Sequence, residues 1–228
     1  MDLERGRQPA IDEAEDAVRD PQQGRSRRSL ESVLAAGIEI LAEGGYDALS
    51  IAAVSERAGV SVGSIYARFK SKATLFAALQ KRMLEDIDAE QEQLFAKASG
   101  TDAQIVDQAI QELATHFHRK EALLRVMIMR GAVDAKAKAL GSASSLRLAR
   151  HFEAHLLKRI GRFNHEDPAL AVDVAFRMVY ASLTRRIISG PTFESPREVP
   201  WEQFVAEVSR ACQLYLVGEC LAKPAVGT

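Results

Sequence analysis

The chain has 228 residues, of which 47% are apolar, and a formal net charge of −1 at pH 7. This length suffices for one small and one larger domain, and the apolar content suffices for packed cores, so the composition excludes a wholly disordered protein. A nearly neutral chain also cannot bind nucleic acid through overall charge alone, so the distribution of charge along the sequence is the informative quantity.

Positive charge is concentrated in one stretch. Residues 25–82 contain nine basic and five acidic side chains, whereas residues 1–24 contain three basic and seven acidic ones. Residues 1–24 are polar and interrupted by Pro9 and Pro21, so they cannot bury enough apolar surface to fold alone and are predicted to form a disordered tail. The basic stretch is the candidate for contact with nucleic acid.

A first helix is predicted after the tail, ending at the pair Gly44–Gly45. Arg27 and Arg28, at the start of this helix, allow two interpretations. They can form a basic arm that enters the minor groove of DNA, or a solvated basic patch that aids non-specific attraction. The apolar positions at helical spacing are Leu30, Val33, Leu34, Ile38 and Leu41.

Residues 50–69 predict two short helices joined by a tight turn. Ser50 can cap the first helix, and Gly59 can stop it by accepting a left-handed backbone. Ser61 can cap the second helix, whose Ile65 and Phe69 are four residues apart and therefore share a buried face. The opposite face is small or amphipathic, which lets a helix approach a DNA groove closely. That face consists of Val62, Gly63, Ser64 and Tyr66.

A cluster of phosphate-binding groups follows the second helix at Lys70, Ser71 and Lys72. Ser71 can cap the next helix, whose free backbone N–H groups can bind a phosphate oxygen, and the lysines add positive charge at the same place. This order of elements is typical of a helix-turn-helix.

The run A-G-V-S-x-G-S-I-Y-x-x-F-x-S-K-x-x-L, within residues 28–79, resembles the DNA-binding domain of the TetR family of transcriptional regulators. The resemblance implies a homodimer that binds a palindromic operator in double-stranded DNA as a repressor and is released by a small apolar molecule. It also implies that Lys72 contacts the DNA backbone and that Ser61 caps the recognition helix. The residues that it places against DNA are Ser50, Val62, Gly63, Ser64 and Tyr66.

Two positions depart from the usual pattern of the family. Ser55 stands where alanine is preferred at the crossing of the two helices, and its hydroxyl is expected to bond a carbonyl one turn earlier. Arg68 stands where histidine or tyrosine is common. It can add a phosphate contact or remain a solvated charge.

The remaining sequence continues as helices without strand-type alternation, which predicts an all-α fold. A long helix over residues 71–97 can connect a DNA-binding domain to a larger body, so that a tilt at its far end moves that domain. We therefore predict a helix-turn-helix domain over 25–72 and a helical ligand-binding and dimerisation domain over 73–228. The later predicted helices are 103–118, 120–129, 132–160, 168–189 and 200–221.

The last two predicted helices each carry an apolar face that can pack inside the chain or against a second copy. Periodicity leaves both arrangements open, whereas the family resemblance implies a four-helix dimer interface, as a two-fold operator requires. The residues predicted for this interface are Phe176, Val179, Leu183, Ile187, Val208 and Cys212.

Soft and aromatic side chains in the middle of the body suit an adaptable apolar pocket, where the resemblance implies a small-molecule effector. The same residue types at helical spacing also form ordinary core, so this alternative stays open. The candidate pocket residues are Phe117, Met127, Met129, Phe152, Phe163 and Met178.

The sequence offers little for a metal site or an enzyme. His116 and His118 are two residues apart and point to different faces of a helix. His151 and His155 share a face, but no cysteine or carboxylate at ligand spacing completes a site. No glycine loop for nucleotides and no nucleophile elbow is present, so we predict no catalytic residue, cofactor or metal. The alternative function is a ligand- or metal-binding helical protein that does not use its helix-turn-helix for specific DNA binding.

The compartment follows from the cysteines and from hydropathy. Cys212 and Cys220 are too far apart along one predicted helix to form a disulfide within it, and both are predicted to be free, mostly buried thiols. No apolar run approaches the length of a bilayer span, and the first residues lack a signal-peptide pattern. We therefore expect a cytoplasmic protein with no membrane partner.

Overall fold

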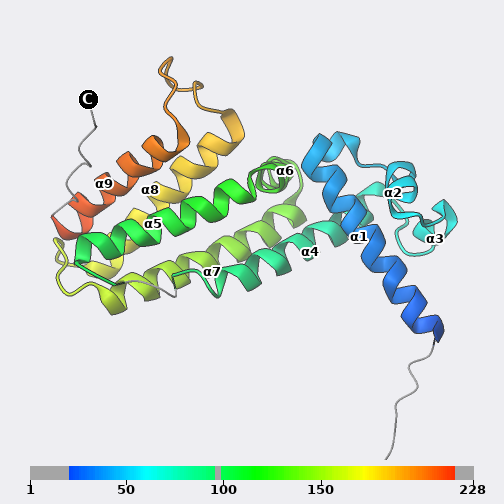
Figure 1. The fold of residues 1–228 in the computed structure, drawn as a ribbon, viewed down its shortest axis with the longest axis horizontal. Coiled ribbons are helices and arrows are strands. Elements are labelled where there is room, and N and C mark those ends of the chain that lie inside the picture. The colour runs from blue at the N-terminus through cyan, green and yellow to red at the C-terminus, as the bar shows by residue number, and fades with distance from the viewer. Residues whose placement is uncertain (1–20, 96–98, 219–228) are drawn as a thin grey trace, which may run out of the picture.

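The computed structural model describes residues 21–95 and 99–218, and every regular element among them is an α-helix, which confirms the predicted fold class. Figure 1 shows α1 to α3 gathered at one end, which we call the head, and α5 to α9 at the other, which we call the body, with α4 running between them. None of the described helices is long and apolar enough to cross a membrane. The helices are α1 (Pro21–Ala48), α2 (Ile51–Ala58), α3 (Val62–Tyr66), α4 (Lys72–Gln91), α5 (Asp102–Arg119), α6 (Glu121–Gly131), α7 (Ala135–Arg159), α8 (Pro168–Ser189) and α9 (Trp201–Val217).

The first helix begins earlier than predicted. Residues 21–24, which the sequence assigned to the tail, belong to α1, and residues 1–20 lie outside the described part of the chain. Proline is favoured in the first turn of a helix, which suits a start at Pro21. The backbone leaves helical geometry at Gly45, where φ is 67°, a conformation that glycine adopts without steric cost. The glycine pair therefore bends the chain where predicted, and a last helical turn continues to Ala48.

The connecting helix is shorter than predicted, because α4 ends at Gln91 instead of near residue 97. Phe95 has a positive φ of 68°, which is uncommon for a residue other than glycine. This turn inserts its ring into the body, with centroids 5.8 Å from Phe152 and 5.3 Å from His155. The backbone N–H of Phe95 donates to Glu112 at 2.6 Å. Burial of the ring offsets the cost of the turn that ends the helix.

Two clusters of buried apolar side chains form the cores of the head and the body. The head's cluster continues past residue 72 into α4, as far as Ile87, and also includes Val126 and Met127 of α6. The second cluster fills the space between α5, α7, α8 and α9. The helices α4 and α6 therefore belong to the packing of the head although they extend to the body.

The structure corrects the predicted dimer interface. Phe176, Val179, Leu183 and Ile187 of α8 and Cys212 of α9 are at most 7% exposed within the single chain, so they cannot contact a second copy. Val208 is partly buried against the same core. The physical reason is that α8 packs its apolar face against α7 and α9 of its own chain. Of the two arrangements that periodicity left open, these five residues follow the intrachain one.

Candidate functional site

Local hydrogen bonds build the first half of the helix-turn-helix. The Ser50 hydroxyl accepts from the backbone N–H of Ala53 at 3.0 Å and caps α2, and Gly59 follows its last residue with φ of 64°. The Ser55 hydroxyl donates to the carbonyl of Val60 at 2.6 Å, so the predicted bond to a carbonyl one turn earlier is wrong. The left-handed turn at Gly59 brings the Val60 carbonyl back to the end of α2, within reach of this hydroxyl.

The recognition helix α3 is held by its cap and by its buried face. The Ser61 hydroxyl accepts from the backbone N–H of Ser64 at 3.3 Å, and Ile65 is fully buried in the head's core. The opposite face is open, as the sequence predicts, with Val62 42% and Tyr66 52% exposed. A Cβ added at Gly63 would meet no atom of the chain within 4 Å. Packing inside the chain therefore does not require glycine there.

Arg68 has a partner within the chain. Its Nη2 donates to the backbone carbonyl of Ser26 at 2.9 Å and to the Ser26 hydroxyl at 2.8 Å. These bonds join the end of the recognition helix to the beginning of α1. They place the exposed side chain of Arg27, which adjoins Ser26, on the part of α1 that is tied to α3.

A capping box begins α4 beside the recognition helix. The Ser71 hydroxyl accepts from the backbone N–H of Thr74, and the Thr74 hydroxyl accepts from that of Ser71. The Lys70 side chain is exposed, whereas the ammonium of Lys72 lies 4.3 Å from the ring centroid of Tyr46. A contact between Lys72 and a DNA phosphate would compete with this cation–π contact.

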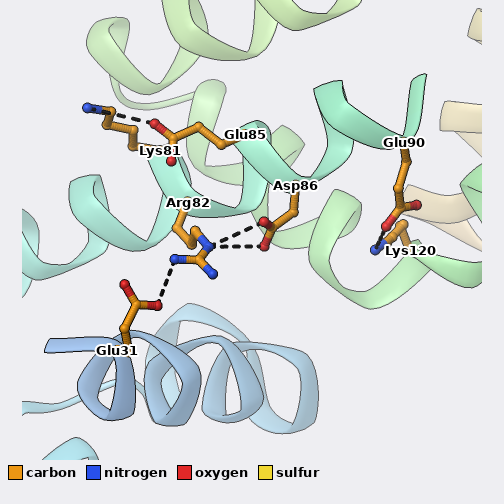
Figure 2. A network of polar contacts seen from close by, with 7 residues as sticks. All are labelled: Glu31, Lys81, Arg82, Glu85, Asp86, Glu90 and Lys120. Carbon is orange, nitrogen blue, oxygen red and sulfur yellow. Dashed lines mark hydrogen bonds and ion pairs between the residues drawn. The ribbon is translucent and has the colours of Figure 1, made fainter. Parts of the chain in front are cut away.

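Ion pairs fix α4 to the head at one point and to the body at another, as Figure 2 shows. Arg82 lies 2.8 Å from Glu31 of α1 and 3.3 Å from Asp86 on its own helix. Further along α4, Glu90 accepts from Lys120 at the α5–α6 junction at 2.6 Å, and this hydrogen bond is the main cause that lowers the pKa of Glu90. Such partly exposed pairs contribute little energy, but they define the position of α4.

A cavity of about 470 Å³ lies between α4, α5, α6, α7 and α8. This volume is typical of sites for small molecules. Two of its polar groups are paired inside the protein: Ser144 donates to Asp88 at 2.7 Å, and the hydroxyls of Ser145 and Tyr180 are 2.7 Å apart. Most of the other lining side chains are apolar, among them Leu84, Ile87, Phe117, Leu124, Met127, Ile128 and Leu148.

Two of the six predicted pocket residues, Phe117 and Met127, line this cavity. Phe152 is fully buried in the body's core, and Phe163 is partly buried against that core. Met129 and Met178 are instead 57% and 40% exposed. Met129 follows Met127 by two residues, so helix geometry directs the two side chains to different faces, and α8 likewise turns Met178 away from the interior. These four residues are corrections to the predicted pocket.

His116 and Gln91 line the cavity but were not predicted to bind a ligand. They are 1% and 3% exposed, and neither ring nitrogen of His116 nor Oε1 of Gln91 has a hydrogen-bond partner. Burial lowers the pKa of His116, although the Glu90 carboxylate lies 3.5 Å from Nδ1. A signal existed in the sequence, because His116 follows Leu113 by three residues and Gln91 follows Ile87 by four.

The other candidate metal and thiol groups are engaged or buried. His151 Nδ1 lies 3.2 Å from the backbone carbonyl of Gln91, and His155 accepts from Arg159 at 3.2 Å. Within residues 21–95 and 99–218, no three histidines, cysteines or carboxylates are grouped to hold a metal ion. Burial raises the pKa of the Cys212 thiol to about 11, and Cys220 lies outside the described residues.

A family profile described as "Bacterial regulatory proteins, tetR family" matches residues 33–79, which include α2, α3 and the capped start of α4. The chain belongs to the tetR family. The HTH-type transcriptional repressor KstR of Mycolicibacterium smegmatis is 37% identical to it over 120 residues, which are 53% of this chain and 56% of that protein. KstR of Rhodococcus jostii is 37% identical over 75 residues. The matched segments thus span about half, and about a third, of these relatives.

Solved structures of tetR-family proteins share the fold over most of the chain. A TetR-family transcriptional regulator from Mesorhizobium loti is 17% identical, with a TM-score of 0.65 over 84% of this chain and 96% of that chain. The regulator FadR of Bacillus subtilis, solved in complex with stearoyl-CoA, is 16% identical, with a TM-score of 0.56 over 83% and 99%. Identities this low show the fold alone.

Proposed function

We propose that this tetR-family chain is a DNA-binding transcriptional repressor that responds to a small, largely apolar molecule. The observation that carries the proposal is the outward face of α3, where Val62 and Tyr66 are exposed beside the open Gly63. Apolar groups on the exposed face of a capped helix that follows a tight turn suit a major-groove reader. The similarity to repressors named KstR supports repression over activation.

The proposed DNA contacts fall into two kinds. On α3, the base-edge contacts are Val62, Gly63, Ser64 and Tyr66. Backbone contacts would come from the caps and cations around this helix, which carry no sequence information but fix its position. They are Ser50, Ser61, Lys70, Lys72, Arg27 and Arg28. Arg68 is not among them, because its guanidinium binds Ser26.

The effector would act through α4. This helix begins at the capping box beside the recognition helix and lines the cavity with Leu84, Ile87 and Gln91. A molecule that binds only one position of α4 favours the corresponding position of the head. A preference of a few kcal/mol is sufficient, since about 1.4 kcal/mol changes operator affinity tenfold.

The effector would be apolar over most of its length, because apolar side chains form most of the cavity wall. The stearoyl-CoA in the FadR structure shows that this fold can hold a molecule with a long apolar chain, and we propose the same general class here.

A homodimer is part of the proposal, because a palindromic operator requires a two-fold protein. The buried face of α8 is not available, so the interface would use the outward faces of α8 and α9. Large apolar side chains there are Leu170, Met178 and Leu214, which are 51%, 40% and 46% exposed.

Fluorescence anisotropy with the DNA upstream of the chain's own gene tests the function, at two salt concentrations and with random duplex as competitor. We expect tight binding that random DNA does not displace. Equal, weak binding to both duplexes would count against a specific operator at that site. Repeating the titration with duplexes that tile the neighbouring genes would then decide whether any specific site exists.

A further inference from the structure

We propose that the cavity selects an uncharged apolar effector with one terminal hydroxyl group, which donates to Nε2 of His116 or Oε1 of Gln91. This inference rests on the proposed effector role of the cavity. It names the chemical class of the ligand, which the exposed face of α3 and the family relationship leave open.

His116 presents a hydrogen-bond acceptor to the cavity. Its ring is 1% exposed, and burial lowers its pKa, so the ring is neutral near pH 7 and carries one proton. The carboxylate of Glu90 lies 3.5 Å from Nδ1 and favours the proton on that atom. Nε2 is then an acceptor, and it has no hydrogen-bond partner within the protein.

Gln91 presents a second acceptor. Its side-chain Oε1 is buried without a partner, and the residue lines the same cavity. The neighbouring polar groups do not supply a donor, because Ser144 donates to Asp88 and the Ser145 hydroxyl bonds that of Tyr180. A buried acceptor without a donor is destabilising. A ligand that donates a hydrogen bond relieves this cost, whereas an ether, ester or thioester oxygen cannot.

The charges around the cavity exclude charged ligand groups at this position. A cationic amine would need a free carboxylate, but Glu90 already binds Lys120 at 2.6 Å and lies 3.8 Å from Arg119. A carboxylate would face two acceptors, Nε2 and Oε1, and be repelled. Of the simple groups, a hydroxyl is the one that donates a hydrogen bond without bringing a charge.

Matched probes separate the donor from the apolar chain. Isothermal titration calorimetry of the full chain with 1-decanol, methyl decyl ether and decanoate compares a donor, a neutral acceptor and an anion on the same alkyl chain. We expect 1-decanol to bind about tenfold or more tightly than either of the other two.

Two variants assign this preference to the cavity. His116→Phe and Gln91→Met each replace an acceptor by an apolar side chain of similar size, and each should reduce the preference for the alcohol over the ether severalfold. Combined, they should abolish it. His118→Phe is the matched control, since His118 lies on the same helix but is exposed and stacks on Trp201. It should leave the preference unchanged. Because two separate variants are used, failure of one to fold does not remove the test.

The outcomes distinguish this inference from the proposed function. Equal binding of alcohol and ether, or a preference that survives in the double variant, overturns the role of His116 and Gln91. Absence of binding by all three probes also overturns it. Operator binding, measured in parallel by anisotropy without probe, reports on the repressor proposal and does not depend on these results.

Discussion

The guanidinium of Arg130 on α6 lies over the ring of Tyr46 near the end of α1, 4.6 Å from its centroid. The ammonium of Lys72 is 4.3 Å from the same centroid, and the ring of Phe76 meets it edge-on at 5.0 Å. One aromatic side chain of the head therefore contacts both α4 and α6, the helix whose Met127 lines the cavity. We expect a change in the position of α6 to reach the head through this ring.

Tyr46→Leu should lower the free energy of unfolding by about 1–3 kcal/mol, because it removes an aromatic pair worth about 0.5–1.5 kcal/mol and cation–π contacts worth about 0.5–1 kcal/mol each. In urea unfolding, a double-mutant cycle of Tyr46→Leu with Arg130→Met should give a coupling energy of about 0.5–1 kcal/mol. Arg177→Met is the control, since Arg177 pairs only with Asp173 on the outer side of α8 among its printed contacts. Equal coupling in both cycles would contradict the link.

Changes on the outward face of α3 should separate affinity from stability. Tyr66→Ala removes a side chain that is 52% exposed, so stability should change by no more than about 0.5 kcal/mol. Operator affinity should fall by about 1–3 kcal/mol, measured by anisotropy. Phe193→Ala, an exposed aromatic residue in the loop before α9, is the control and should bind the operator like the parent chain. Loss of affinity in both variants would point to a general defect.

The dimer proposal gives different outcomes for two residues of the same helix. Met178→Glu places a charge on the outer face of α8 and should yield folded monomers in sedimentation velocity. Leu183→Glu places a charge in the core, where the residue is fully buried, and should destabilise the chain by several kcal/mol. A folded dimer in the Met178→Glu variant would exclude this face as the interface, and Leu170→Glu and Leu214→Glu would then test its remaining parts.

His155 should make the chain less stable in acid. Burial, and secondarily Arg159, lower its pKa from 6.5 to about 4 in the folded state. Between these values the unfolded chain binds a proton that the folded chain does not, so stability falls as the pH drops from about 6.5 towards 4, by at most on the order of 3 kcal/mol. His155→Phe should remove part of the loss between pH 7.5 and pH 5 in urea unfolding. His118→Phe, at an exposed site, should leave it unchanged. An equal loss in the parent chain and in His155→Phe would contradict this assignment.

The sequence by itself determined the helix-turn-helix and the all-α class. Helix caps and glycine turns are made between residues within one or two turns of each other, as with the bonds of Ser50 to Ala53 and of Ser61 to Ser64. The residue types at these positions therefore carry the structural information directly. The exposed face of α3 followed from the same local rules, since Ile65 identifies the buried side of a short helix.

Only the tertiary structure decided which apolar faces meet each other. Periodicity shows that Leu183 and Met127 point inward, but not that Leu183 lies in its own chain's core or that Met127 lines a cavity. The same holds for His116, whose inward position was visible in its spacing, whereas its unpaired nitrogens depend on what surrounds it. Burial and hydrogen bonding of a side chain are set by neighbours distant in the sequence, and the spacing of residues along one helix does not record them.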